Sequence, residues 1–197
     1  MTPLLMGIGD GPAALLDERG SLDFRGVFGD LARRSSEIRV AVTRIRLSTV
    51  DLTAVELARL RELRVVISEM NALSLDAEAR TLRHHPRRAP NLVFMTDLLN
   101  EGRLQLRSSP LAGWAPDFTV FSRDLGAFAV LVGPHWFERP YPHRGPAFVS
   151  VHQGDAARMA ARRFDELWTE AHDIGSAAWS ILHRARPPQV ALRATGG

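Results

Sequence analysis

Apolar positions in the first third of the chain alternate between helical and strand spacing. Residues 24–31 place four apolar side chains at helical intervals after Ser21, which predicts an amphipathic helix with a serine cap. The segment EIRVAVTRIRL (37–47) alternates as a strand does. Residues 51–62 return to helical spacing, and LRVVIS (63–68) is a short apolar run typical of a strand covered on both faces.

The same alternation continues into the middle of the chain. Residues 74–84 predict a helix that ends before Pro86, and NLVFMT (91–96) predicts a third apolar strand. A short turn of helix then leads to RLQLRSS (103–109). Strands alternating with helices favour an α/β fold: a three-layer α/β/α sandwich around a mixed, mainly parallel sheet.

The rhythm changes after residue 116. DFTVFS (117–122) and AFAVLV (127–132) are joined by the tight segment RDLG, which predicts a β-hairpin. AFVSV (147–151) follows a long loop, and residues 155–172 predict a helix with one apolar face. We therefore expect one α/β domain.

The expected domain covers 21–175, between an N-terminal segment (1–20) and a C-terminal extension (176–197). Within that extension, residues from about 184 onward contain breakers without periodicity, so we expect disorder there.

The amino-acid composition excludes several kinds of chemistry and does not indicate a particular one. Of 197 residues, 45% are hydrophobic and 24% charged, which is ordinary for a globular protein. There is no cysteine, which excludes disulfides and thiolate chemistry. All 25 basic residues are arginine, so no mechanism can use a lysine amine. The formal net charge is only +3, so the sequence pI of 10.7 overstates how basic the surface is.

The chain also lacks the usual targeting patterns. Its first residues carry Asp10 and Asp17 and no basic region, unlike a signal peptide, and no stretch approaches the ~18 apolar residues of a membrane span. From these features we expect a cytoplasmic protein.

The order of elements from the hairpin onward resembles a half-domain of the phospholipase D superfamily. The resemblance rests on a strand from Asp117, a tight turn, an apolar strand ending at Gly133, and a late helix containing FDELW (164–168). It covers roughly residues 24–172 and implies a phospholipase D-like α/β fold. In that superfamily the first hairpin strand carries His-x-Lys, an Asp follows at the turn, and the second strand ends in Gly-Ser or Gly-Gly.

The catalytic motif of the family is degenerate here. In the register that keeps the family's spacing, Asp117 takes the position of His, Thr119 takes that of Lys, and only Asp124 matches. Gly133 then lies two residues too far along and is followed by proline. Shifting the register by two restores that distance but places Thr119, Phe121 and Gly126 at the three positions, where nothing catalytic remains. The family's His is the nucleophile and its Lys neutralises phosphoryl oxygens, and neither Asp117 nor Thr119 can do this. The resemblance therefore implies a binding, sensor or scaffold module for an anionic ligand or a partner protein.

The resemblance also implies an oligomeric state. Two half-domains pack together in the superfamily, so a single half-domain is expected to form a homodimer. A phosphodiesterase or phosphotransfer enzyme that uses other residues, with His135 and His143 as candidates for nucleophile or base, remains an alternative.

Polar residues at the ends of the predicted parallel strands are candidates for ligand binding, because ligands bind beyond the carboxyl ends of such strands. Arg44 follows the first strand in phase with its apolar face, Glu69 and Asn71 follow the second, and Thr96 and Asp97 follow the third. Solvated loop residues would show the same pattern.

The loop 133–146 holds two His, two Arg, a Trp and the only Tyr. It is open to three interpretations: a metal site with His135, His143 and His152 or Glu138, in a spacing that matches no standard zinc pattern; an anion site; or a proline-stiffened structural loop. We predict no metal and no cofactor. The ligand-binding candidates are Arg44, Glu69, Asn71, Asp117, Thr119, Arg139, Tyr141 and Arg144.

A basic cluster at His84, His85, Arg87 and Arg88 makes a nucleic-acid-binding regulator a further alternative. A solvated surface loop at the end of a helix is the favoured explanation of the cluster, because the net charge is only +3 and no aromatic residue is interleaved with its charges.

Overall fold

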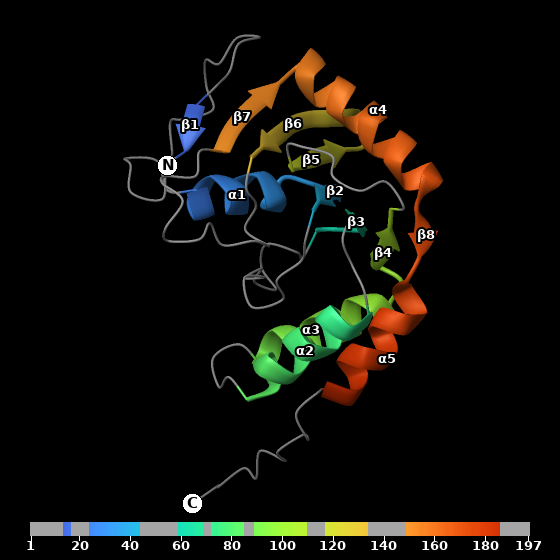
Figure 1. Cartoon of the computed structure of the whole chain (residues 1–197). Helices are drawn as coiled ribbons and strands as arrows, with labels where there is room; N and C mark the ends of the chain where they lie inside the picture. Colours follow the sequence, from blue (N-terminus) through green and yellow to red (C-terminus); the bar gives the residue numbers. More distant parts are fainter. Residues whose placement is uncertain are drawn as a thin grey trace, which may run out of the picture.

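The computed structural model describes residues 14–16, 24–43, 59–68, 72–84, 89–109, 117–133 and 149–185. The elements in these ranges are β1 (Ala14–Leu16), α1 (Phe24–Arg33), β2 (Glu37–Val42), β3 (Glu62–Ile67), α2 (Ala72–Arg83), α3 (Ala89–Asn100), β4 (Leu104–Ser108), β5 (Phe118–Arg123), β6 (Gly126–Val132), β7 (Val149–Gln153), α4 (Asp155–Glu170), β8 (His172–Asp173) and α5 (Gly175–Ala185). Figure 1 shows their arrangement in space.

One mixed sheet runs through the described residues in the order β1-β7-β6-β5-β2-β3-β4-β8. Strands β2, β3 and β4 are parallel to one another, and the other pairings, β1–β7, β7–β6, β6–β5, β5–β2 and β4–β8, are antiparallel. The expectation of a mixed sheet is confirmed, but its pairings are mostly antiparallel. The predicted hairpin is confirmed as β5 and β6, with an irregularity between Phe121 and Ser122.

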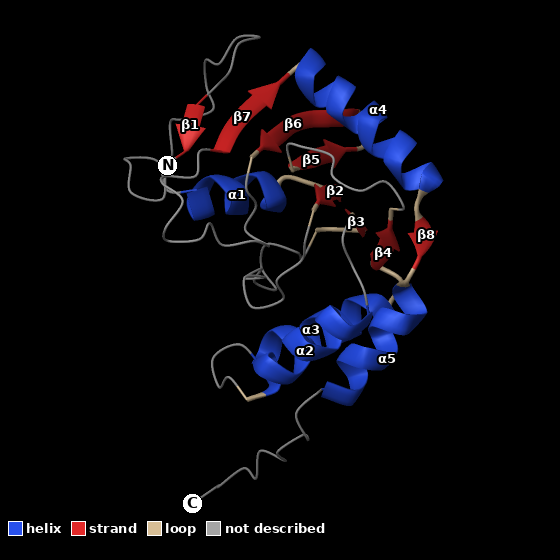
Figure 2. Cartoon of the chain, viewed as in Figure 1, coloured by secondary structure: helices blue, strands red, loops and turns tan. Residues whose placement is uncertain are grey.

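Helices cover both faces of the sheet, so the predicted three-layer α/β/α architecture is confirmed (Figure 2). Helix α4 packs alone on one face, where Phe164 and Leu167 are fully buried against Val66 and Val120. Helices α1, α2, α3 and α5 cover the other face around a larger apolar cluster that includes Ile38.

The strand predicted at 91–96 is wrong, because this segment belongs to helix α3. A continuous apolar run does not by itself distinguish a strand from a buried helix. Leu92, Met95 and Leu98 are nearly fully buried at intervals of three residues, which is helical spacing. The helix is apolar around its circumference because it lies between the sheet, α2 and α5. The third parallel strand is β4 instead, so Thr96 and Asp97 lie on a helix and not at a strand end.

Three further elements differ from the sequence-based prediction. Strand β1 pairs with β7, and helix α5 packs on α2 and α3, although no element was predicted at either place. Of the helix expected at 51–62, residues 59–62 are described, and they form a turn followed by the first residue of β3. The alternating pattern of 37–47 is confirmed as a strand for Glu37–Val42.

Candidate functional site

Asp117 lies at the corner where strands β2, β5 and β6 meet. Its Oδ1 accepts hydrogen bonds from both the backbone N–H and the hydroxyl of Thr43, each at 2.9 Å. Its backbone carbonyl accepts a third bond, from the N–H of Gly133, also at 2.9 Å. Asp117, which the resemblance places at the family's nucleophile position, therefore joins the ends of three strands.

The other two residues of the degenerate motif are in quite different surroundings. Thr119 has no exposed surface. Asp124 lies in the turn after β5 and pairs with Arg61, and both side chains are more than two-thirds exposed. At about 3.3 Å per residue, the seven residues from Asp117 to Asp124 place these two carboxylates roughly 20 Å apart, at opposite ends of the strand.

Most of the site residues expected from the sequence lie outside the described residues. These are Arg44, Glu69, Asn71, His135, Glu138, Arg139, Tyr141, His143 and Arg144, together with His85, Arg87 and Arg88 of the basic cluster. His152, on β7, is described; its ring nitrogen lies 2.8 Å from the hydroxyl of Ser150. Among the described residues, no group of three His, Cys, Asp or Glu side chains is placed to hold a metal ion.

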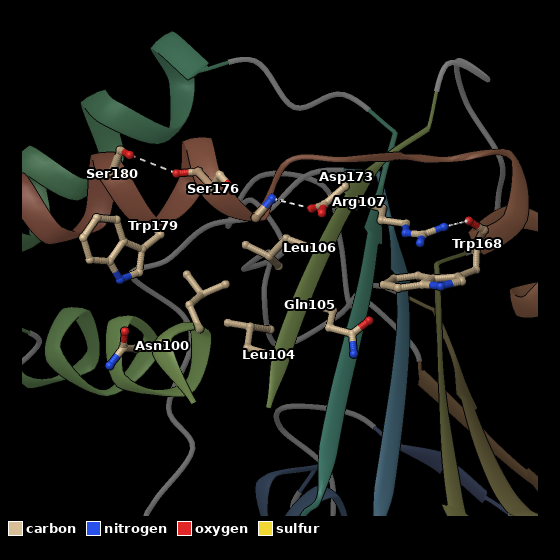
Figure 3. Close-up of a pocket in the computed structure, with 12 residues that line it drawn as sticks. Asn100, Leu104, Gln105, Leu106, Arg107, Trp168, Asp173, Ser176, Trp179 and Ser180 are labelled. Carbon is tan, nitrogen blue, oxygen red and sulfur yellow. Dashed lines mark hydrogen bonds between the residues drawn. The ribbon is translucent and has the colours of Figure 1, made fainter. Parts of the chain in front are cut away.

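A pocket of about 500 Å³ opens at the edge of the sheet formed by β4 and β8 (Figure 3). Its walls come from β4, the end of α3, Trp168 of α4, and the first turns of α5. The lining residues are Leu99, Asn100, Leu104, Gln105, Leu106, Arg107, Trp168, Asp173, Gly175, Ser176, Trp179 and Ser180. Leucines form one part of the wall, and two tryptophans, Arg107, the carboxylate of Asp173 and several neutral polar groups form the rest.

Arg107 is the cation of this pocket, and Trp168 holds it in place. Its Nη1 donates a 2.7 Å hydrogen bond to the Trp168 carbonyl, and its guanidinium carbon lies 4.4 Å from the Trp168 ring centroid. Arg64, on the neighbouring strand β3, lies 5.6 Å from the same ring. Within the described part of the chain, the bond to the Trp168 carbonyl is the one hydrogen bond of the Arg107 guanidinium. Its other N–H groups therefore remain available to an anion.

Asp173 lies beside Arg107, and Trp179 lies on the opposite side of the pocket from Trp168 (Figure 3). Asp173 is the register partner of Arg107 in the β4–β8 pair, and its Oδ1 accepts a 2.7 Å bond from the N–H of Gly175 at the start of α5. The Trp179 ring stacks on His183 with the centroids 4.7 Å apart, and the tryptophan remains 37% exposed. An aromatic surface is thus available near the arginine.

Sequence reasoning missed this pocket because α5 was not predicted. Ala178, Ile181, Leu182 and Ala185 are buried and recur at helical intervals, and this was the available signal. Trp168 is partly buried against Phe164, with the ring centroids 5.6 Å apart. The polar members of the pocket carry no sequence signature of their own.

A second charged cluster lies on the face of the sheet covered by α4. Glu37 accepts hydrogen bonds from Arg39 Nε at 2.8 Å and Nη2 at 2.9 Å, and it also pairs with Arg64. Burial by itself would raise the pKa of Glu37. The hydrogen bonds from Arg39 and Arg64, with their charges, outweigh burial and hold this pKa below its ordinary value of 4.5. The same carboxylate raises the pKa of Arg39 against the opposing effect of burial.

No protein-family model matches the sequence, and no curated protein matches it either. Several solved structures resemble the chain. TrmBL2, an archaeal chromatin protein described as showing a novel mode of DNA binding, is 14% identical over 81% of this chain and 52% of its own, with a TM-score of 0.50. The chain therefore spans about half the length of TrmBL2.

Two further solved structures also resemble the chain. Nuc from Salmonella typhimurium, a phospholipase D family member, is 13% identical over 81% of this chain and 97% of its own, with a TM-score of 0.49. NucT from Helicobacter pylori is 10% identical over the same shares, with a TM-score of 0.43. A phospholipase D family member is thus among the similar structures, as the sequence predicted, and at these identities the likeness concerns the fold alone.

Within the described residues, none of the helices combines the length and the apolar character that a membrane span requires.

Proposed function

We propose that this chain is a binding domain with a phospholipase D-like fold, that it does not perform the phosphoryl transfer of that superfamily, and that it takes a small anionic ligand in the pocket at Arg107. One observation carries the first part of the proposal. The residue in the nucleophile's position is a carboxylate whose Oδ1 accepts two hydrogen bonds from Thr43.

The chemistry of the corner supports this. A carboxylate in place of the family's His repels a phosphate instead of attacking it, and Asp117 is already engaged in joining β2 to β5. The position of the family's Lys is taken by Thr119, which is uncharged and fully buried. Since the chain contains no lysine, no other residue can supply the missing amine.

The pocket supports the second part. An arginine whose guanidinium is held by Trp168, through the ring contact and one Nη hydrogen bond, keeps its remaining donors oriented, so less side-chain entropy is lost when an anion binds. Trp179 and the leucines Leu99 and Leu104 provide a surface for an apolar or planar group. The volume of about 500 Å³ is in the range of small-molecule sites.

Binding is tested by intrinsic tryptophan fluorescence with two probes, inorganic phosphate and adenosine monophosphate. We expect saturable titrations for the wild type, with the nucleotide the tighter of the two because of its planar group. Arg107→Gln should weaken both by at least tenfold. Arg158→Gln, an exposed arginine on α4, is the matched control and should bind as the wild type does. Absence of binding in the wild type, or unchanged binding in Arg107→Gln, would refute the pocket as the site.

The lack of phosphoryl transfer is tested with bis(p-nitrophenyl) phosphate and with single-stranded and duplex DNA, in the presence and absence of EDTA. We expect no hydrolysis above the uncatalysed rate. Hydrolysis by the wild type that disappears in His143→Ala would instead establish the alternative enzyme that uses a histidine of the 133–146 loop.

The proposed domain also acts as a homodimer, since a half-domain pairs with a second copy in the superfamily it resembles. Light scattering at micromolar concentration should give twice the mass of 21.8 kDa. A monomer at all concentrations would contradict this part while leaving the pocket proposal intact.

A further inference from the structure

Four arginines lie at one end of the central strands, and the Asp117 corner lies at the opposite end. Arg61 and Arg103 immediately precede β3 and β4, and Arg34 lies shortly before β2. Arg123 ends β5, which runs antiparallel to β2, so its last residue lies beside the first residues of the parallel strands. Four adjacent strands, in the order β5-β2-β3-β4, thus each have one arginine at or just before the end that they share. We call Arg34, Arg61, Arg103 and Arg123 the arginine row.

Backbone hydrogen bonds and two bonds from arginine side chains connect the segments that carry the arginine row. The N–H of Ser36 donates to the carbonyl of Ser122 at 2.9 Å, and the N–H of Arg61 donates to the carbonyl of Ser36 at 2.8 Å. Arg123 Nε donates to the carbonyl of Arg34 at 2.9 Å, and Arg103 Nη2 donates to the carbonyl of Leu60 at 2.6 Å. With strands about 4.8 Å apart, the row extends over roughly 15 Å.

Acidic groups balance only half of the row. Arg61 pairs with Asp124, and Arg103 pairs with Glu101 at 3.1 Å. Arg34 and Arg123 are exposed and lie over the ring of Phe128, at 5.4 and 4.6 Å from its centroid. Among the described residues, neither of these two arginines forms an ion pair. The row therefore carries a net positive charge, concentrated at Arg34 and Arg123.

We propose that the arginine row binds the phosphate backbone of duplex DNA. Arg34, Arg61 and Arg123 are exposed, and the row has one arginine for each of four adjacent strands, which fits a succession of phosphates along a nucleic-acid strand better than a single small anion. The ring of Phe128 and the carbonyl of Arg34 restrain the Arg123 guanidinium, while its Nη groups have no hydrogen-bond partner among the described residues. Because the contacts go to phosphates, the binding is independent of base sequence.

The proposal is separate from the pocket at Arg107, since it uses other residues at another part of the sheet. It also differs from the basic cluster at His84–Arg88, which the sequence alone had indicated. An anionic membrane is the competing partner for such a surface, because Leu125, at the tip of the β5–β6 turn, is fully exposed. A lone leucine is a small apolar anchor, and the linear arrangement of the charges favours the nucleic acid.

The test is fluorescence anisotropy with a fluorescein-labelled 20-base-pair duplex of mixed sequence, titrated at several NaCl concentrations from 50 mM upward. The test variant is Arg34→Gln/Arg123→Gln. The matched control is Arg158→Gln/Arg163→Gln, which removes the same charge from exposed positions on α4. Circular dichroism and thermal melting establish that both variants are folded.

We expect the wild type to bind with micromolar affinity at 50 mM NaCl, without preference between two unrelated sequences. Loss of two phosphate contacts should lower the slope of log K against log salt by about 1.8 in magnitude. The test variant should bind at least fivefold more weakly, and the control within twofold of the wild type.

Three results would overturn the proposal: no DNA binding by the wild type, equal loss in test and control variants, or unchanged binding in the test variant. Vesicles containing 30% phosphatidylserine form the comparison arm. If the test variant loses vesicle binding while DNA binding is absent or unaffected, the row is a lipid surface instead. Failure of the pocket titrations at Arg107 would not affect these outcomes.

Discussion

The two ends of the central strands use their polar side chains in opposite ways. At the end where β2 stops and β5 starts, Asp117 is turned inward and accepts two bonds from Thr43. At the other end, Arg34 and Arg123 extend over an aromatic ring and remain exposed. The difference shows that Asp117 at one end contributes to cohesion between strands, whereas the arginines at the other end leave charge exposed to solvent.

Of the variants that test this comparison, Asp117→Ala is expected to have the largest effect on stability. Removing the carboxylate leaves the buried-side N–H and hydroxyl of Thr43 without their acceptor, which should cost about 2 kcal/mol of the free energy of unfolding. Urea denaturation monitored by circular dichroism measures this.

Thr43→Val is the companion variant, because it removes the hydroxyl donor and leaves the backbone N–H bond to Asp117 in place. It should cost about 1 kcal/mol. A loss below about 0.5 kcal/mol for Asp117→Ala would mean that the corner does not hold the strands together and is free for another role.

An intermediate effect is expected from Glu37→Gln, at the charged cluster on the α4 face. The lowered pKa of Glu37 means that the folded state favours its ionised form, through Arg39 and Arg64. Its contribution to stability is therefore present above pH 4.5, the ordinary value, and is lost as the pH falls through the lower pKa of the folded state.

The measurement is the free energy of unfolding of wild type and Glu37→Gln between pH 7 and pH 3. At pH 7 the variant should be less stable by about 1 kcal/mol, discounted for partial exposure of the cluster, and the gap should close below pH 4.5. A gap that stays constant with pH would show that packing, not charge, explains the difference.

The smallest stability effect is expected from Asp124→Asn at the arginine row. Its ion pair with Arg61 is mostly exposed, so the free energy of unfolding should change by about 0.3 kcal/mol or less. Because a negative charge leaves the row, we expect DNA binding in the anisotropy experiment to tighten about twofold. Weaker binding would indicate that Asp124 orients Arg61 productively, and a large stability loss would make the two ends of the strands alike.

Sequence patterns predicted those elements whose periodicity matched their burial. The hairpin of β5 and β6 and the helix α4 were confirmed because a tight turn and an apolar face are local features. Residues 91–96 were assigned to a strand because a helix enclosed on most sides loses its polar face. The first turns of α5 are small and polar, which hid the helix from the same reasoning.

Sites formed across several strands were harder to predict than elements. The arginine row depends on the order β5-β2-β3-β4, in which residues as far apart in sequence as Arg34 and Arg123 become neighbours. The pocket depends on α5 returning to the end of α3. The sequence singled out Asp117 and Thr119 through the resemblance, but the bond from Thr43 to Asp117 required the structure.

Helix α5 has a consequence for how the chain is made. Helices α2 and α3 each contact α5 more extensively than they contact each other. The ribosome synthesises α2 and α3 long before α5. Because α5 is the last described element to leave the exit tunnel, the apolar faces of α2 and α3 stay uncovered until then. This layer is therefore completed only after α5 has been synthesised, and a nascent chain arrested before Gly175 would present the uncovered apolar surfaces of α2 and α3 to chaperones.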